Sequence, residues 1–328
     1  MTNQPANNDA IHSYTAANQW PVKLLKNTRV INNMLSGYIP PVHAQVMPTN
    51  RCNLKCAFCS CKKRNKDLEL STLELIDLLD ALVTLGGRAI TITGGGEPLM
   101  HAGLADVIQH AFALGLEIGL VTNGTLMSSL SPAAIDCLTW CRVSASDEGN
   151  RLKCIQDAVK EHGGVEWALS YVLTSKYDLD NIEAHIDFAN LHNFTHVRLV
   201  SDLINLKQVP LMDTIKRALQ ERNVYDKLVI YQGRKEFQRG MQDCRISLLK
   251  PVIGPDGLIY PCCGVQYAQS TQALDLPNSM AMGHIDDIVE IYTEHRIFDG
   301  SGCKRCYYAE YNALMDLIMT PVTHRRFV

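Results

Sequence analysis

Short apolar runs of strand length alternate along the chain with longer segments in which apolar residues recur at helical spacing. One helix opens with a capping box, Ser71 and Glu74, and ends at Gly86. The predicted strands are 43–47, 89–93, 117–121, 142–146, 167–173 and 196–200, and the predicted helices are 71–85, 104–114, 131–140, 151–162 and 179–191. Parallel strands need helical crossovers, so the pattern predicts a parallel α/β fold whose working edge is the C-terminal end of its strands. Periodicity alone leaves a barrel and a doubly wound sheet open.

The residues before the first predicted strand do not show this alternation. Residues 1–20 are polar and rich in asparagine, which predicts a loose tail, and residues 22–35 have the pattern of a short helix ahead of Pro40 and Pro41. The strand 43–47 then runs into Pro48 and leads into a cysteine-rich loop.

That loop carries Cys52, Cys56 and Cys59. Thiolates are the usual protein ligands of an iron-sulfur cube, and three of them leave the fourth iron without a protein donor. The spacing, C-x3-C-x2-C, resembles the signature of the radical S-adenosylmethionine (radical SAM) superfamily. Cys61 follows two residues later, so a structural zinc is the alternative, although zinc sites usually pair one knuckle with a distant second one.

The resemblance implies a fold, an activity and cofactors. The fold is α/β, a partial (β/α)6 TIM-like barrel over residues 43–205. The activity is reductive cleavage of S-adenosylmethionine, bound at a 4Fe-4S cluster, to a 5'-deoxyadenosyl radical that abstracts hydrogen from a substrate carbon. Phe58 occupies the position where the family carries an aromatic residue, which would help to keep water from the open iron.

Glycines follow the second predicted strand. In the family, a Gly-Gly-Glu stretch at this place binds the methionine amino group of the cofactor, and we carry that role over to Gly95, Gly96 and Glu97. Glycine lets a backbone approach a ligand closely. The alternative is an ordinary tight turn between a strand and a helix.

Polar residues near the ends of later strands extend the expected cofactor site. Asn123, Ser144 and Asp147 are expected to meet a ribose or a carboxylate, although asparagine, serine and aspartate also form turns and caps. Ser170 and Arg198 are expected to point into the barrel, because a buried cation suits a carboxylate. A structural ion pair is the alternative for Arg198.

A second set of cysteines lies in the last third of the chain: Cys244, Cys262, Cys303 and Cys306. Their arrangement resembles the twitch domain, a shortened relative of the SPASM domain, and implies one fully ligated auxiliary 4Fe-4S cluster that relays electrons. A hairpin turn at Pro255, Asp256 and Gly257 fits this, with residues 258–260 as the returning strand. Cys263 could replace Cys262 as the ligand, and a zinc ribbon remains the alternative.

The chain accordingly divides into five parts. These are an N-terminal tail and helical extension (1–42), the barrel (43–205), a linking helix and strand (206–239), a twitch-like domain (240–310) and a C-terminal helix and tail (311–328).

Composition bears on partners and location. The formal charge of -3 and a pI near 6.4 provide no global attraction for nucleic acid. No apolar signal region or membrane-spanning run is present, so we expect a cytoplasmic protein whose twelve cysteines stay reduced. The basic run 62–66 favours a solvated face, and alternatively a docking site for an acidic electron donor such as flavodoxin or ferredoxin.

One auxiliary cluster favours a two-electron oxidation or a rearrangement of a small molecule. A peptide-modifying enzyme that forms a crosslink or epimerises a residue is the alternative, and a noncatalytic cluster scaffold is a third reading. A GTP cyclisation of the molybdopterin type is disfavoured, because residues 323–328 lack the terminal double glycine of that family.

Overall fold

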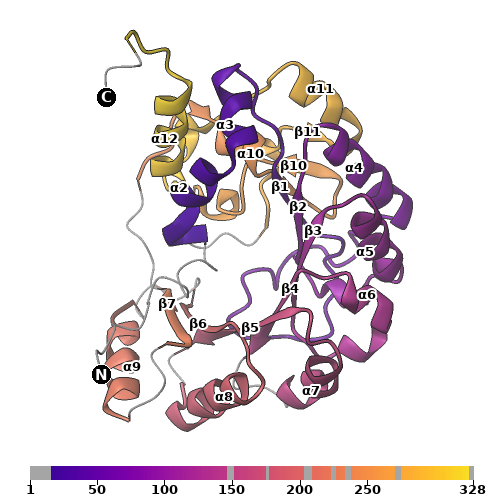
Figure 1. Ribbon diagram of the computed structural model, residues 1–328, viewed down its shortest axis with the longest axis vertical. Helices are drawn as coiled ribbons and strands as arrows, with labels where there is room; N and C mark the ends of the chain where they lie inside the picture. Colours follow the sequence, from indigo (N-terminus) through magenta and orange to yellow (C-terminus); the bar gives the residue numbers. More distant parts are fainter. Residues whose placement is uncertain are drawn as a thin grey trace, which may run out of the picture.

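A curved sheet with helices on its outer side forms the body of the protein, shown by a computed structural model (Figure 1). The structure describes residues 16–145, 151–174, 177–202, 209–222, 227–232, 238–269 and 275–324. Ten strands pair in the order β11-β10-β9-β1-β2-β3-β4-β5-β6-β7, and β12 and β8 form a separate pair. The expected α/β fold with a largely parallel sheet is confirmed.

Seven parallel strands make the barrel wall. They are β1 (His43–Val46), β2 (Ala89–Ile92), β3 (Glu117–Thr122), β4 (Trp140–Ala145), β5 (Glu166–Leu173), β6 (His196–Ser201) and β7 (Val229–Gln232). All six predicted strands are present, and β7 pairs in parallel with β6 as a seventh. Their C-terminal ends share one edge, so the loops that follow them lie together.

The helices between these strands cover the outer face of the wall (Figure 1). They are α4 (Thr72–Thr84), α5 (Leu104–Ala113), α6 (Pro132–Asp136), α7 (Arg151–Glu161), α8 (Leu179–Leu191) and α9 (Val209–Glu221). The predicted capping box is present at α4, where Ser71 and Glu74 exchange hydrogen bonds. Side chains on the outer strand face, such as Val143, Leu169 and Leu199, are completely buried against these helices.

The last third of the chain continues the same sheet. β9 (Val252–Ile253) pairs in parallel with β1, and the hairpin to β10 (Leu258–Tyr260) turns at Gly257 with a φ of 74°, as predicted. β11 (Gly283–His284) follows β10, and α10 (Ile246–Leu249), α11 (Ile288–Thr293) and α12 (Ala309–Met319) complete this part. The separate pair is β8 (Asp243–Cys244) with β12 (Phe298–Asp299). The cysteine-rich segment therefore adjoins the strand that leads into the first cysteine loop.

Two predictions about local structure are wrong. The predicted helix 131–140 ends at Asp136, because Trp140 already pairs with Gly119 as the first residue of β4. The N-terminal segment forms two helices, α2 (Ala16–Lys26) and α3 (Thr28–Leu35), because the Asn27 side chain caps the second helix through the amide of Val30. The predicted loose tail of residues 1–20 is therefore wrong for residues 16–20, which belong to α2. Residues 1–15 lie outside the described residues.

Both N-terminal helices pack with α12. The Trp20 and Tyr311 rings stack at 4.4 Å between centroids. None of the helices in the described ranges has the length and apolar character that crossing a membrane requires.

Candidate functional site

The first cysteine loop leaves β1 through a buried segment, Thr49 and Asn50, and is anchored at Arg51. The Arg51 guanidinium forms a two-point ion pair with Glu69, at 2.7 and 2.9 Å, and also donates to the carbonyl of Met100 at 3.0 Å. Cys52, Cys56 and Cys59 follow, none of them in a disulfide and all partly exposed. The loop therefore has a fixed base and accessible thiols.

The glycine loop after β2 lies directly against this base. The amide of Gly96 donates to the carbonyl of Thr49 at 3.0 Å, and the amide of Glu97 donates to the carbonyl of Arg51 at 2.7 Å. A Cβ on Gly96 would lie 1.9 Å from the Arg51 carbonyl oxygen, and one on Gly95 would lie 1.9 Å from Asn50 Oδ1. These positions exclude any side chain, because the cysteine loop fills the space.

Glu97 connects the glycine loop to the end of β3. Its carboxylate is 2% exposed and accepts hydrogen bonds from the Thr122 hydroxyl at 2.5 Å and from the Asn123 amide at 2.7 Å. It also accepts from the amide of Leu99 at 3.1 Å. Glu97 thus fixes the relative position of the loops after β2 and β3.

Asn123 completes this connection on the side of the cysteines. Its side-chain amide donates to Asn53 Oδ1 at 2.9 Å, while Asn53 donates to the Thr125 hydroxyl at 2.8 Å. Asn53 directly follows Cys52 and was not singled out from the sequence. The loops after β1, β2 and β3 are therefore one hydrogen-bonded unit at the C-terminal edge of the barrel.

The basic run after the cysteines is only partly solvated. Lys62 and Lys63 are exposed, as predicted for a solvated face, but Arg64 is 4% exposed. Its guanidinium donates to Gln266 Oε1 at 2.6 Å, and Gln266 Nε2 in turn donates to the carbonyl of Ser60 at 2.9 Å. The interpretation as a purely solvated face is wrong for Arg64. Its role is to join the cysteine loop to the last third of the chain.

Cys61 lies in the same basic surroundings. A hydrogen bond from the Cys59 thiol lowers the pKa of Cys61 to about 6, and the charges of Arg64 and Lys66 act in the same direction. The Cys61 amide points at Cys59 Sγ, at 3.4 Å. The fourth cysteine of this loop is thus in contact with the third.

The remaining predicted cofactor residues lie on the barrel strands. Ser144 and Ser170 pair across β4 and β5, and Ser170 pairs with Arg198 across β5 and β6. Arg198 Nη2 lies 3.5 Å from Ser170 Oγ. Phe58 is partly buried in the cysteine loop, and Asp147 lies outside the described residues.

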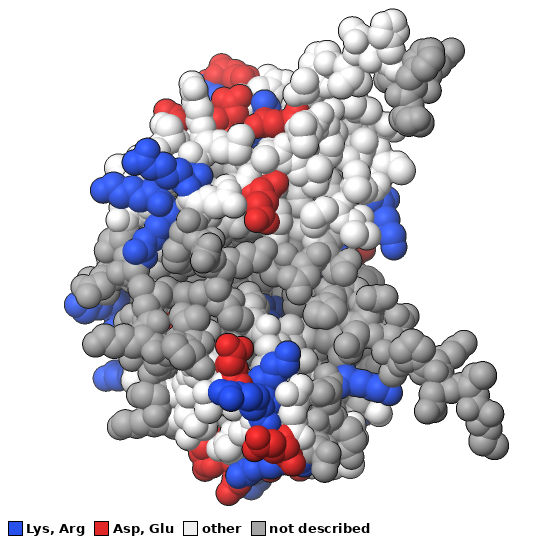
Figure 2. Space-filling model, turned by 90° about the vertical axis from the view of Figure 1, so that its left-hand side faces the viewer, with Lys and Arg blue, Asp and Glu red and all other residues white. Residues whose placement is uncertain are grey.

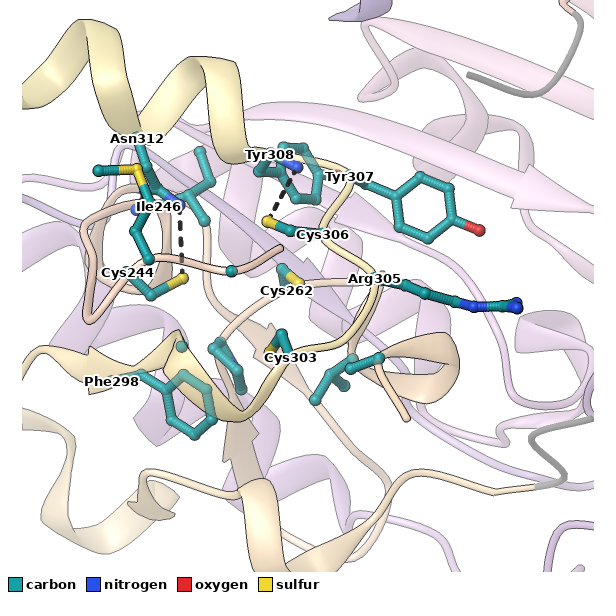
Figure 3. Close-up of a pocket in the computed structure, with 17 residues that line it drawn as sticks. Cys244, Ile246, Cys262, Phe298, Cys303, Arg305, Cys306, Tyr307, Tyr308 and Asn312 are labelled. Atoms are coloured by element: carbon teal, nitrogen blue, oxygen red, sulfur yellow. Dashed lines mark hydrogen bonds between the residues drawn. The ribbon is translucent and has the colours of Figure 1, made fainter. Parts of the chain in front are cut away.

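The second set of cysteines lines one cavity. Cys244, Cys262, Cys303 and Cys306 all belong to its lining (Figure 3). Cys244 comes from β8, Cys262 follows β10, Cys303 ends the turn Gly300–Gly302, and Cys306 precedes α12. Residues from four separate elements therefore converge here. Burial raises the pKa of Cys244 to about 12.

Two donors point at sulfur atoms of this cavity. Asn312 Nδ2 lies 3.7 Å from Cys244 Sγ, while its Oδ1 accepts from the Ile246 amide at 2.9 Å. The amide of Tyr308 lies 3.4 Å from Cys306 Sγ (Figure 3). Sequence reasoning missed Asn312, which is completely buried on α12 one turn after Tyr308.

Cys263, the alternative ligand, occupies a different position from Cys262. It is exposed, and its sulfur lies 2.9 Å from the Tyr308 hydroxyl. It is absent from the cavity lining, whereas Cys262 is part of it.

The residues at both places fit iron-sulfur clusters. The C-terminal cavity combines four thiols with N–H donors aimed at sulfur, a usual environment for a cluster. The N-terminal loop carries three thiols directly after a segment, Thr49 to Arg51, that hydrogen bonds to the neighbouring loops hold in position. Within the described ranges, no three His, Cys, Asp or Glu side chains converge as closely as a single metal ion would require.

Part of the chain is similar to known proteins. Residues 46–138 match the family model of the radical SAM superfamily. The AdoMet-dependent heme synthase of Oleidesulfovibrio alaskensis is 36% identical over 103 residues, which is 31% of this chain and 26% of that protein. The GTP 3',8-cyclase of Pseudomonas syringae is 30% identical over 156 residues, 46% of this chain and 42% of that protein. The chain thus spans well under half the length of these curated relatives.

The fold is also similar to solved structures. Streptococcus suis SuiB bound to its precursor peptide SuiA superposes with a TM-score of 0.57 at 17% identity, covering 90% of this chain and 78% of SuiB. SuiB bound to S-adenosylmethionine gives the same TM-score. The match of residues 46–138 contains all three cysteines of the first loop, the glycine loop and Glu97, and the chain therefore contains a radical SAM domain, the family that the cysteine spacing indicated.

Proposed function

We propose that this chain is a radical SAM enzyme. When bound, a 4Fe-4S cluster and S-adenosylmethionine would supply an electron and a 5'-deoxyadenosyl radical, which takes hydrogen from a substrate carbon. The observation that carries the proposal is the cysteine loop itself. Its three thiols follow Thr49 and Arg51, whose carbonyls accept hydrogen bonds from the glycine loop. All these residues lie within the segment that matches the family.

Within this proposal, Cys52, Cys56 and Cys59 hold the first cluster, and Gly95, Gly96 and Glu97 form the cofactor amine site. The carboxylate of Glu97 already accepts three hydrogen bonds from the protein. We therefore assign its main contribution to holding the loop, so that the backbone of the glycines faces the cofactor. Phe58 would restrict water at the open iron.

Other contacts to the cofactor are proposed at Asn123, Ser144, Asp147 and Ser170. Asn123 would act chiefly by fixing the residue after Cys52, since its amide donates to Asn53. Ser170 would offer a hydrogen bond to a carboxylate inside the barrel. The cofactor contact expected for Arg198 from the sequence is not proposed, because Arg198 lies in the middle of β6 and not at its end.

The experiment is anaerobic reconstitution, followed by iron and sulfide counting and an assay for 5'-deoxyadenosine with dithionite. About eight irons per chain are expected from two cubes. Cys56→Ala should abolish 5'-deoxyadenosine formation, whereas Cys154→Ala, which removes an exposed thiol on α7, is the matched control. A reconstituted protein that never forms 5'-deoxyadenosine would leave the scaffold interpretation in place.

The second cluster is proposed at Cys244, Cys262, Cys303 and Cys306, in a twitch-like domain. Four thiols would saturate a cube, which suits electron transfer more than substrate binding. Cys262→Ser should halve the iron content to about four per chain. The matched variant Cys263→Ser, at the exposed neighbour outside the cavity lining, should keep all the iron.

The proposed net reaction is a two-electron oxidation or a rearrangement of a small molecule. Peptide modification is the second candidate, because the fold resembles that of SuiB, which has been solved with its precursor peptide. Deuterium incorporation into 5'-deoxyadenosine from labelled candidate substrates separates the two.

The proposed electron donor is a flavodoxin or ferredoxin that approaches Lys62 and Lys63. Both lysines are exposed and follow the cluster loop directly, which suits steering of an acidic donor by a local basic patch. Glutamate at both positions should slow flavodoxin-driven turnover and leave dithionite-driven turnover unchanged. Equal loss with both donors would contradict this role.

Partners beyond the donor are small molecules or peptides in this proposal. Figure 2 shows Lys and Arg interspersed with Asp and Glu on one side of the molecule, without a face of a single sign. A cytoplasmic location is proposed because none of the twelve cysteines forms a disulfide.

A further inference from the structure

Two arginines lie on the inner face of the barrel wall, on strands separated by one other strand. Arg142 of β4 pairs in register with Ala168 of β5, and Ser170 of β5 pairs with Arg198 of β6. Residues two apart on a strand share a face, so all four side chains lie on the same side of the sheet. The strand between the arginines carries only small residues there.

Neither arginine forms an ion pair with a carboxylate in the described part of the chain. The Nε atoms of both are buried and make no hydrogen bond there. Arg142 packs 5.4 Å from the Trp140 ring, and Arg198 reaches only Ser170 Oγ at 3.5 Å. Both residues nevertheless keep partial exposure.

The charges of the two arginines affect each other and a third residue on the same face. Burial lowers the pKa of Arg142 to about 10, and burial followed by the charge of Arg142 lowers the pKa of Arg198. Burial and then both arginines lower the pKa of His196, on the same face of β6, to about 3. Uncompensated like charges in a buried place are costly, and a bound anion offsets that cost.

We propose that Arg142 and Arg198 form an oxyanion site inside the barrel that binds a carboxylate or phosphate group of the substrate. Each guanidinium presents a planar fork that matches two oxygens of such a group. The inference deepens the proposed function, on which it rests, by naming a substrate class: molecules with an anionic group close to the carbon that loses hydrogen.

The depth of the pair favours the substrate over the cofactor as the source of the anion. Arg142 and Arg198 are each the third residue of a six-residue strand, whereas the proposed cofactor loops follow the strand ends. The pair therefore lies one layer below that edge, where a substrate held beneath the cofactor would reach.

The test measures thermal unfolding of the anaerobically reconstituted full chain during titration with inorganic phosphate or acetate, at constant ionic strength with chloride. The midpoint should rise by about 2 °C at ten times the half-saturating concentration of the better anion. Arg142→Gln and Arg198→Gln should each lose this rise, and Arg142→Lys should retain part of it. Arg217→Gln, at an exposed arginine of α9, is the matched control and should keep it.

A second measurement needs no ligand. If the two arginines repel each other, either glutamine variant should unfold about 2 °C above the wild type without added anion, although a purely structural arginine would lower the midpoint when removed. A lower midpoint in both variants, or an anion effect that persists in both, would overturn the inference. It would also fail if Arg142→Gln weakened binding of S-adenosylmethionine as strongly as binding of phosphate or acetate, because the pair would then serve the cofactor.

The outcomes separate this inference from the proposed function. Arginine-dependent anion binding in a protein that forms no 5'-deoxyadenosine would contradict only the proposed radical SAM activity. Formation of 5'-deoxyadenosine without such anion binding would sink only the oxyanion site.

Discussion

Arg64 donates to Gln266 across 2.6 Å and connects the loop of the first three cysteines to the segment that follows Cys262. The arginine is almost fully buried, and the carboxylate of Asp275, 3.8 Å from its Nε, is exposed. Gln266 also donates to the carbonyl of Ser60, which lies next to Cys59. One glutamine therefore holds both the buried cation and the backbone of the cluster loop.

Gln266→Leu should destabilise the protein by about 2–3 kcal/mol, because it leaves a buried guanidinium without its main acceptor. The thermal midpoint should fall, and the iron content of the reconstituted protein should drop toward four per chain as the N-terminal loop loosens. Gln242→Leu, at an exposed glutamine, is the control. Combining Gln266→Leu with Arg64→Met should cost less than the sum of the single changes, since no unpaired charge remains. Strict additivity would contradict the coupling.

Gly96→Ala should disrupt the packing of the glycine loop on the cysteine loop. The added Cβ would meet the Arg51 carbonyl oxygen at 1.9 Å, and backbone cannot yield as a flexible side chain can. We expect a loss of about 2–4 kcal/mol in stability and weaker binding of S-adenosylmethionine. Gly164→Ala is the matched control, because a Cβ there meets nothing within 4 Å. Equal midpoints for the two variants would show that the loops do not interlock.

Sequence patterns predicted local structure better than long-range pairing. Strand and helix bounds agree within about two residues where one periodicity dominates, as for 179–191, which coincides with α8. The helix 131–140 was wrong because Leu138 and Cys141 belong to an apolar run that suits a buried strand as well as a helix. The pairing of β9 with β1 joins residues about two hundred positions apart, and no local signal encodes it.

In the candidate site, too, local motifs are visible in the sequence and long-range contacts are not. The three cysteines and the glycine loop are contiguous motifs that the sequence displays directly, whereas Asn53 and Asn312 are isolated residues whose partners come from distant elements. Arg142 had one usable signal. It alternates with buried Cys141 and Val143, so the strand pattern places a cation on the inner face.

Asn312→Asp should lower the reduction potential of the proposed C-terminal cluster. The variant keeps an oxygen that can accept from the Ile246 amide, but it loses the N–H that points at Cys244 Sγ, 3.7 Å away. A hydrogen bond to sulfur stabilises the reduced, more negative cluster, and a loss of about 1 kcal/mol corresponds to roughly 40 mV for one electron. Anaerobic redox titration followed by electron paramagnetic resonance measures the shift. An unchanged potential would exclude Cys244 as a ligand of the titrated cluster.

Stability should fall as the medium becomes acidic, in part because of His43. Burial, followed by the charge of Lys250, lowers the pKa of this histidine to about 3, and its Nε2 lies 2.7 Å from the Thr91 hydroxyl. An unfolded chain takes up the proton near pH 6.5, so between pH 6.5 and 3 the unfolded state binds more protons than the folded one. The contribution of His43 to the free energy of unfolding is therefore greatest above pH 6.5. It decreases below that pH by about 1.4 kcal/mol per pH unit.

His43→Gln isolates this contribution, because glutamine does not titrate and can still bond to Thr91. The difference in unfolding free energy between variant and wild type should move in favour of the variant by about 1 kcal/mol between pH 7.5 and 5.5. Chemical denaturation of both proteins under anaerobic conditions measures it, and other acid-sensitive groups cancel in the comparison. His295→Asn, at an exposed histidine with a φ of 52° that asparagine tolerates, is the control. A difference that stays constant with pH would mean that His43 takes up its proton inside the folded barrel, so that the interior beside β1 admits water and charge.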